Sequence, residues 1–395
     1  MGWKLEPRRE ESRAMMLAAP VIAVVATLIA GAIVFTLLGE NGPGAVYQIF
    51  VAPLLSLNRW QDLLVKAAPL AIIAVGLSVG FRANIWNIGA EGQYILGGLA
   101  GTGVALQTLD LEGGWILPLM ILAGVLGGMA WAAVPAFLKT RLNVNEILSS
   151  LMLNYVAIQL LYYLMRGPWK DPEGFNFPQT AMFSADQTLP MAVPGTLIHI
   201  GVPIAAALGL TAWFLMVRSI TGFQIRVIGL APDAARYGGF RQASTMWLAM
   251  LVGGGMAGLA GVLEAAGPFG QMVPQFPTGY GYTAIIVAFL GRLNPLGILL
   301  AALVLALTYV GGESAQTVIG LPAAATGVFQ AMMLFFLLAT DMLVRYRLTR
   351  TTPAPARTAP AAAAGEPSAG SGRPGEPPPP AGDRIQRERT EAAAL

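Results

Sequence analysis

The residues best suited to chemistry are a few polar side chains set inside long apolar stretches. The segment 84–93 reads NIWNIGAEGQ and interrupts what would otherwise be continuous apolar sequence. Irregular backbone at membrane depth persists only where it is buried in protein or lines a cavity, and a carboxylate facing lipid is costly. We therefore expect Glu91 to point inward and to be hydrogen-bonded. A simple turn capped by Asn87 and Glu91 is the alternative interpretation.

A second interruption occurs in the other half of the chain. Segment 268–281 carries three Gly and three Pro residues, and segment 291–295 reads GRLNP. Broken hydrophobic segments, one in each half of a chain, are the usual sequence sign of a path across a membrane. The residues that we predict to line this path are Asn84, Trp86, Asn87, Glu91, Gln93, Glu264 and Gln271. Asn154 and Gln159 are better suited to hydrogen bonds between helices.

Several kinds of enzyme chemistry lack the residues that they need. The chain of 395 residues contains no Cys and a single His, His199. Thiol nucleophiles, disulfides and Cys-ligated metals are excluded, and catalysis based on His is disfavoured. No Ser–His pair, paired Asp residues or set of metal ligands is evident in the sequence. We predict that the chain is not an enzyme, holds no cofactor or metal, and binds no nucleic acid.

The composition indicates a membrane protein. Hydrophobic residues make up 55% of the chain and charged residues 11%, with a mean hydropathy of +0.62, whereas a soluble domain carries about 25% charged residues. Helices that cross a bilayer need about 20 apolar residues. Such runs lie at 15–38, 62–82, 92–109, 115–138, 147–165, 197–217, 245–265, 279–292, 296–311 and 322–344. We predict an all-α, polytopic membrane bundle of about ten helices.

Small and basic residues add detail to this map. Gly pairs with the spacing G-x-x-x-G, at 97/101, 124/128 and 254/258, predict close contacts between helices. The basic residues that follow or precede the apolar runs are Arg8, Arg9, Arg13, Arg82, Lys139, Arg141, Arg218, Arg226, Arg236, Arg241, Arg292, Arg345, Arg347 and Arg350. With about ten crossings all of them fall on one side, which the positive-inside rule assigns to the cytoplasm together with both termini.

The same map divides the chain into three parts. Residues 1–14 form a cytoplasmic N-terminus, 15–348 the transmembrane domain, and 349–395 a Pro- and Ala-rich cytoplasmic tail. The tail cannot bury enough apolar area to offset the entropy of ordering, so we predict that it is disordered. On the outer side, the loop 166–195 is either a docking surface or a plain connector.

The longest internal cytoplasmic segment, 222–241, contains a predicted short helix. Pro232 suits the first position of a helix, and Asp233 would lie near the positive end of its dipole. Ala234, Ala235 and Arg236 continue the helix, and the pair Gly238-Gly239 supplies a stop. A small, rigid helix on the cytoplasmic face is suited to contact a soluble partner. A basic loop retained inside by its charge is the alternative.

These motifs carry a resemblance to a known family. The order Gly229, Ala235-Arg236, Gly238 resembles the coupling helix of ABC-importer permeases of the branched-chain amino acid, ribose and nucleoside group. The NIGAEGQ segment is similar to a signature of that family, and NVNEILSSLMLNY at 143–155 resembles a second signature of the same family. RGPWKDP at 166–172 looks like a loop of its nucleoside branch, which is also described as a simple-sugar branch. The resemblance extends from about Gln61 to Arg345.

The resemblance implies a function and a set of partners. It implies a permease subunit in the bacterial plasma membrane that works with a second permease subunit, identical or paralogous. Two ATPase subunits would bind inside, at Gly229, Pro232, Asp233, Ala235, Arg236 and Gly238, and a substrate-binding lipoprotein outside. The chain has no G-x-x-x-x-G-K-[ST] motif, so ATP would be used by the partner.

The solute implied by the resemblance is a nucleoside, with a ribose-like simple sugar as the alternative. Trp86, Tyr94, Tyr280 and Tyr282 could stack on a base, although aromatic residues near the ends of spans also serve as interface anchors. An ion-coupled secondary transporter is a further alternative, which would depend on carboxylates such as Glu91, Glu264 or Asp341.

Overall fold

The computed structural model describes residues 2–7, 13–37 and 39–351. Residues Leu5–Leu348 form one compact unit. The predicted tail lies almost wholly outside the described residues, as does part of the predicted N-terminal segment. In the described part, regular structure is helical except for β1 (Gly2–Pro7) and β2 (Tyr346–Thr351), which pair in a two-stranded sheet. The nearly all-helical fold confirms the predicted fold class.

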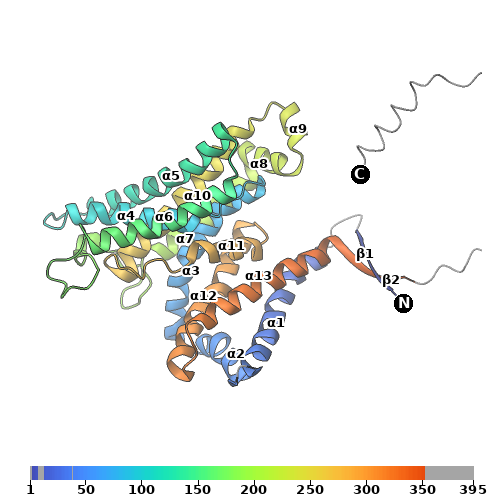
Figure 1. Cartoon of the computed structure of the whole chain (residues 1–395), viewed down its shortest axis with the longest axis horizontal. Coiled ribbons are helices and arrows are strands. Elements are labelled where there is room, and N and C mark those ends of the chain that lie inside the picture. Colours follow the sequence, from blue (N-terminus) through green and yellow to red (C-terminus); the bar gives the residue numbers. More distant parts are fainter. Residues whose placement is uncertain (1, 8–12, 38, 352–395) are drawn as a thin grey trace, which may run out of the picture. The chain divides into compact units, whose positions relative to one another are not determined.

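Every predicted apolar run falls on a helix. The helices are α1 (Arg13–Leu37), α2 (Gly42–Phe50), η1 (Ala52–Leu55), α3 (Leu57–Arg82), α4 (Ala90–Gln107), α5 (Ile116–Leu142), α6 (Glu146–Arg166), η2 (Ala185–Gln187), α7 (Gly201–Arg218), α8 (Ile220–Leu230), α9 (Pro232–Tyr237), α10 (Gln242–Glu264), the π-helical η3 (Ala265–Phe269), α11 (Tyr280–Leu290), α12 (Pro295–Ile319) and α13 (Ala324–Arg345). Figure 1 shows how they follow one another along the chain.

Seven of the described helices are long and apolar enough to cross a membrane. They are α1 from Ala18, α3, α5, α6, α7, α10 extended to Phe269, and α12. Helix α4 is not among them, and α11 and the apolar part of α13 (Ala324–Thr340) are shorter than a span. The chain is therefore a polytopic helical membrane protein, and the number of about ten crossings stays a prediction.

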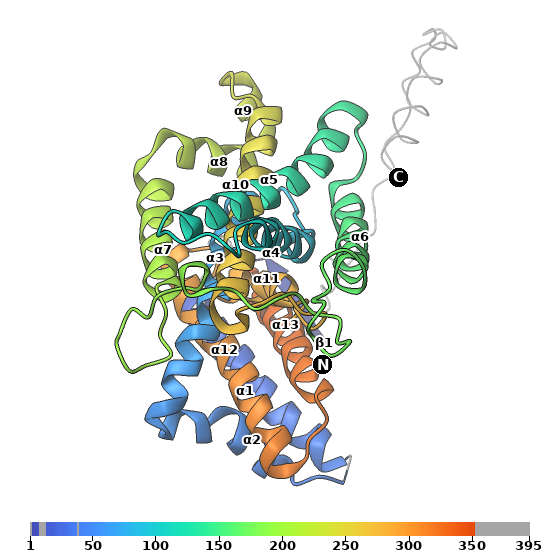
Figure 2. The ribbon, with the colours of Figure 1, turned by 90° about the vertical axis from the view of Figure 1, so that its left-hand side faces the viewer.

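Helix α3 lies at the centre of the compact unit. Every residue from Ala67 to Phe81 is buried, and α7, α10, α11 and α12 all pack against this helix. A helix that is apolar on all sides can be buried on all sides, which is why this run occupies the core. In Figure 2, α9 and α2 lie at opposite ends of the unit, with α3 between them.

The predicted Gly pairs meet where α4, α5 and α10 cross. A Cβ on Gly97 would lie 2.2 Å from the Cα of Gly258, and one on Gly258 would lie 2.2 Å from the carbonyl oxygen of Gly124. A Cβ on Gly128 would lie 2.1 Å from the carbonyl oxygen of Gly254. Only residues without a side chain allow the backbones to approach this closely, so these motifs position the three helices.

A separate group of buried apolar side chains forms what we call the inner cluster. It consists of Val79, Ala83, Ile85, Ala136, Met216, Ile225, Ile228, Ala235, Met246, Ala249 and Met250. These residues come from the end of α3, from α5, and from α7 to α10. The inner cluster therefore joins the short helix α9 to the end of the central helix.

Candidate functional site

The segment 84–93 is a turn held by its own side chains. Asn84 has a left-handed backbone, with φ of 56°, and its side-chain oxygen accepts a hydrogen bond from the Trp86 indole at 3.1 Å. The amides of Asn87 and Gln93 are buried and form two hydrogen bonds with each other, at 2.9 and 3.1 Å. Asn87 also accepts from the backbone N–H of Gly89 at 3.0 Å. These polar groups satisfy one another, which allows the turn to be buried.

Asn154 on α6 attaches this turn to two other helices. Its side-chain oxygen accepts from the backbone N–H of Gly92 at 2.8 Å. Its amide nitrogen donates to the carbonyl of Ile88 at 2.9 Å and to the hydroxyl of Tyr282 on α11 at 3.0 Å. Asn154 is fully buried and therefore has the interhelical role predicted for it.

Glu91 joins the two interruptions predicted from the sequence. It is 1% exposed and lies in the first turn of α4. One carboxylate oxygen accepts from the backbone N–H of Gly279 at 3.0 Å, and the other accepts from Gly281 at 2.7 Å. These N–H groups belong to the start of α11, where a helix has unpaired donors and the positive end of its dipole. Glu91 thus caps α11, and a Cβ on Gly281 would lie 2.2 Å from the Glu91 backbone nitrogen.

The aromatic side chains near the turn are covered by other aromatic rings. Trp86 packs against Phe289 at 5.7 Å between ring centroids. Tyr94 stacks on Phe276 at 4.7 Å, and its edge contact with Tyr280 is 6.0 Å between centroids. Tyr94 is 0% exposed and Tyr280 is 2% exposed. The prediction that these two tyrosines offer faces to a base was wrong, because both side chains are buried against other aromatic rings.

The predicted cytoplasmic helix is α9. Pro232 occupies its first turn with Asp233, and Arg236 lies in its last turn. The side chains of Asp233 and Arg236 are exposed, whereas Ala235 is buried. Asp233 and Arg236 are therefore available for contact with a partner, whereas Ala235 packs inside the protein.

Helix α9 ends at the predicted Gly238-Gly239 pair. Gly238 has φ of −72°, and the left-handed residue is Gly239, with φ of 79°. The N–H of Phe240 returns to the carbonyl of Ala235 at 3.0 Å. Gly239, the second residue of the predicted pair, therefore supplies the conformational freedom that ends the helix.

Helix α9 is connected to the polar turn through the protein interior. Ala235 belongs to the inner cluster together with Ile85, which lies in the turn itself. Gly229 of α8 lies against the end of α3, since a Cβ there would be 1.9 Å from the carbonyl oxygen of Arg82. A groove of about 350 Å³ is bordered by Asn84 and Pro232 and by the end of α5 and the start of α6, where Lys139 and Glu146 form a 2.9 Å ion pair.

Glu264 lies in a different place from the polar turn. It is 6% exposed at the end of α10 and borders a cavity of about 550 Å³ together with Lys66 and His199. Gln271 follows η3, and its side-chain oxygen is buried with no hydrogen-bond partner in the described part of the chain. The predicted path residues are therefore not gathered into one cavity: Asn87, Glu91 and Gln93 are buried within protein, while Asn84 and Glu264 border separate spaces.

Comparison with known proteins identifies the family. Residues 60–338 match the model of the branched-chain amino acid transport system permease component. The chain belongs to this permease family. A glucose ABC transporter permease protein, TsgB13 of Haloferax volcanii, is 37% identical over 87% of this chain and 93% of its own length. The nucleoside permease protein NupB of Lactococcus lactis is 27% identical, over 80% of this chain and 89% of its own. The guanosine permease protein NupP of Bacillus subtilis is 26% identical, over 83% and 94%. The chain is accordingly the membrane-spanning permease component of an ABC importer.

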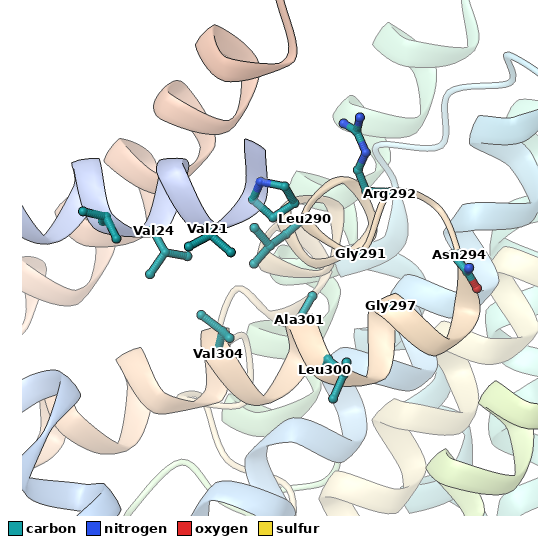
Figure 3. A pocket seen from close by; sticks show the side chains of 12 residues that line it. Val21, Val24, Leu290, Gly291, Arg292, Asn294, Gly297, Leu300, Ala301 and Val304 are labelled. Atoms are coloured by element: carbon teal, nitrogen blue, oxygen red, sulfur yellow. The ribbon is translucent and has the colours of Figure 1, made fainter. Parts of the chain in front are cut away.

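One groove on the permease is unsuited to a polar solute. It has a volume of about 730 Å³ and lies between α1, α12 and the segment that joins α11 to α12. Figure 3 shows apolar side chains such as Val21, Val24 and Val304 along it, with Arg292 and Asn294 towards one end. An apolar surface of this kind on a membrane helix matches lipid acyl chains rather than a hydrated solute.

Two residues of the permease escaped the sequence prediction. Lys66 lies inside the apolar run 62–82, and a charged residue in a span is a recognised sign of function; the sequence carried that signal. His199 was considered only for metal or acid–base chemistry, and its single occurrence carried no indication of the cavity that it borders.

Proposed function

We propose that this permease moves an uncharged, sugar-bearing solute inward across the bacterial plasma membrane. A nucleoside is the first candidate, supported by the relatives named for guanosine and nucleosides and by the RGPWKDP loop. A simple sugar is the second candidate, supported by the more similar relative that is named for glucose. Both solutes carry a hydroxylated ring, so a site that hydrogen-bonds to ring hydroxyl groups could bind either of them.

The proposed partners are those of an ATP-driven importer. ATPase subunits bind the exposed face of α9 inside, a binding lipoprotein docks outside, and a second permease subunit completes the membrane pair. The observation that carries this proposal is the placement of Ala235. This residue is fully buried in the inner cluster while its neighbours Asp233 and Arg236 are exposed, so a force on α9 is transmitted into the protein rather than lost in a loose loop.

The proposed mechanism follows these contacts. Closure of the ATPase subunits displaces α9, and the inner cluster transmits that motion to Ile85 and the polar turn. Glu91 then transmits it to α11 through its bonds to Gly279 and Gly281. A packed core with two discrete arrangements converts such a displacement into a change of access to the path.

An uptake assay tests this function. The permease is reconstituted into proteoliposomes with its ATPase subunits and binding protein, and uptake of tritiated guanosine and of tritiated D-glucose is measured with and without ATP. We expect uptake of one of them that requires ATP and is unaffected by a proton ionophore. Uptake driven by an ion gradient without ATP would instead support the ion-coupled alternative that depends on carboxylates such as Asp341, whose side chain lies outside the described residues.

A further inference from the structure

We propose that the permease has its own binding site for the vicinal hydroxyl groups of a sugar ring, in the cavity bordered by Glu264 and His199. This inference rests on the proposed function and adds a substrate subsite to it. The cavity is bordered by the start of α3, the end of α10 and the segment 188–199. The distribution of basic residues predicts that these two helix ends lie on the outer side of the membrane. Its volume of about 550 Å³ lies in the usual range of about 300–1,000 Å³ for small-molecule sites.

His199 borders this cavity and carries an unused donor. The side chain is 5% exposed, and its Nδ1 atom accepts a hydrogen bond from the backbone N–H of Gly201 at 3.1 Å. A neutral imidazole that accepts at one nitrogen carries its proton on the other. Nε2 is therefore the donor, and it has no hydrogen-bond partner among the described residues. A buried donor without a partner destabilises the protein unless a ligand or water satisfies it.

Glu264 presents an unused acceptor beside it. Its side chain is 6% exposed, and no described residue donates a hydrogen bond to its carboxyl group. Glu264 and His199 border the 550 Å³ cavity and also a second space of about 10 Å³ next to it, so the two side chains lie in the same region. Lys66, on the same cavity, is engaged with Glu313 at 2.6 Å.

This pairing of groups selects a ligand. A vicinal diol offers one hydroxyl that donates to the Glu264 carboxyl and an adjacent hydroxyl oxygen that accepts from His199 Nε2. The remaining wall is largely apolar, with Val65, Leu189 and Met191, and suits the face of a sugar or base. Asp62 also borders the cavity, so a phosphorylated solute would meet like charges. The site fits an uncharged sugar or nucleoside.

Direct binding to the full-length permease in lipid nanodiscs tests the site. The probes are tritiated guanosine and tritiated D-glucose, each of which carries vicinal hydroxyl groups, and the two arms distinguish a nucleoside from a free sugar. We expect saturable binding of at least one probe. If guanosine binds, 2′,3′-dideoxyguanosine should compete about tenfold less well or worse, because the hydrogen bonds to its hydroxyls are missing.

Variants locate the binding. Glu264→Gln removes the negative acceptor, and His199→Asn keeps an acceptor for the Gly201 N–H while removing the Nε2 donor; each should weaken binding about tenfold. Glu112→Gln, the same change at an exposed carboxylate on the predicted outer side, should have no effect. If one variant fails to fold, as judged by its elution in size-exclusion chromatography, the other decides the matter.

Two results overturn the inference: neither probe binds, or binding is the same in the His199 and Glu264 variants as in the parent. The uptake assay separates this failure from failure of the proposed function. If guanosine or glucose is taken up with ATP but the His199 and Glu264 variants bind it as the parent does, only the proposed subsite is refuted. If neither solute is taken up with ATP, the proposed function itself is refuted.

Discussion

The bond between Glu91 and α11 is the contact whose loss should be easiest to measure. Glu91→Gln keeps one acceptor oxygen but turns an NH₂ group towards the second backbone N–H, either at Gly279 or at Gly281. One charge-assisted hydrogen bond, worth about 1.5–3 kcal/mol, is lost, and one buried N–H is left unpaired at a cost of about 1–3 kcal/mol. The lower desolvation cost of a neutral side chain offsets part of this. We expect the start of α11 to be destabilised by about 2–4 kcal/mol.

Hydrogen exchange measured by mass spectrometry gives the test. In the Glu91→Gln permease, amides at 279–284 should exchange at least about tenfold faster, because about 1.4 kcal/mol corresponds to a factor of ten. Glu112→Gln should exchange as the parent does, since that carboxylate is exposed. We also expect ATP-driven uptake to fall while expression and binding of the ATPase persist. If amides at 279–284 exchange at the parental rate in this variant, the capping role of Glu91 is refuted. If they exchange faster but uptake is unchanged, Glu91 holds α11 in place and has no part in transport.

Three further predictions concern α9 and the membrane topology. Arg236→Glu reverses an exposed charge at the proposed ATPase contact and should lower co-purification of the ATPase at least about tenfold. The reason is that an unfavourable charge at an interface costs about 2–5 kcal/mol when it is buried. Unchanged recovery of the ATPase would place the contact elsewhere. Gly239→Val should destabilise the end of α9 by more than about 1 kcal/mol, because a β-branched residue is strained at positive φ, whereas Gly238→Ala should be tolerated. The midpoints of thermal unfolding compare the two variants, and equal midpoints would contradict the assignment of Gly239 as the residue that ends the helix. Reporter fusions at Trp169 and Arg350 should report opposite sides of the membrane, and the same side for both would contradict the predicted topology.

Local features of this permease could be predicted from the sequence because they depend on neighbouring residues. Apolar runs become helices wherever they meet lipid or core, since the backbone must satisfy its own hydrogen bonds there. Pro232 and Asp233 begin α9 because a missing N–H and a negative charge both suit the start of a helix. The burial of Glu91 was also predictable, because a carboxylate facing lipid is costly.

The partners of these residues were decided by the tertiary structure alone. Nothing near Glu91 in sequence indicates that its carboxylate caps α11 at Gly281, because that contact depends on how α3, α4 and α11 pack. The coverage of Tyr94 by Phe276 and the shared cavity of His199 and Glu264 arise in the same way. Sequence spacing predicts which residues share a face of one helix, but only the packing of several helices determines which faces meet.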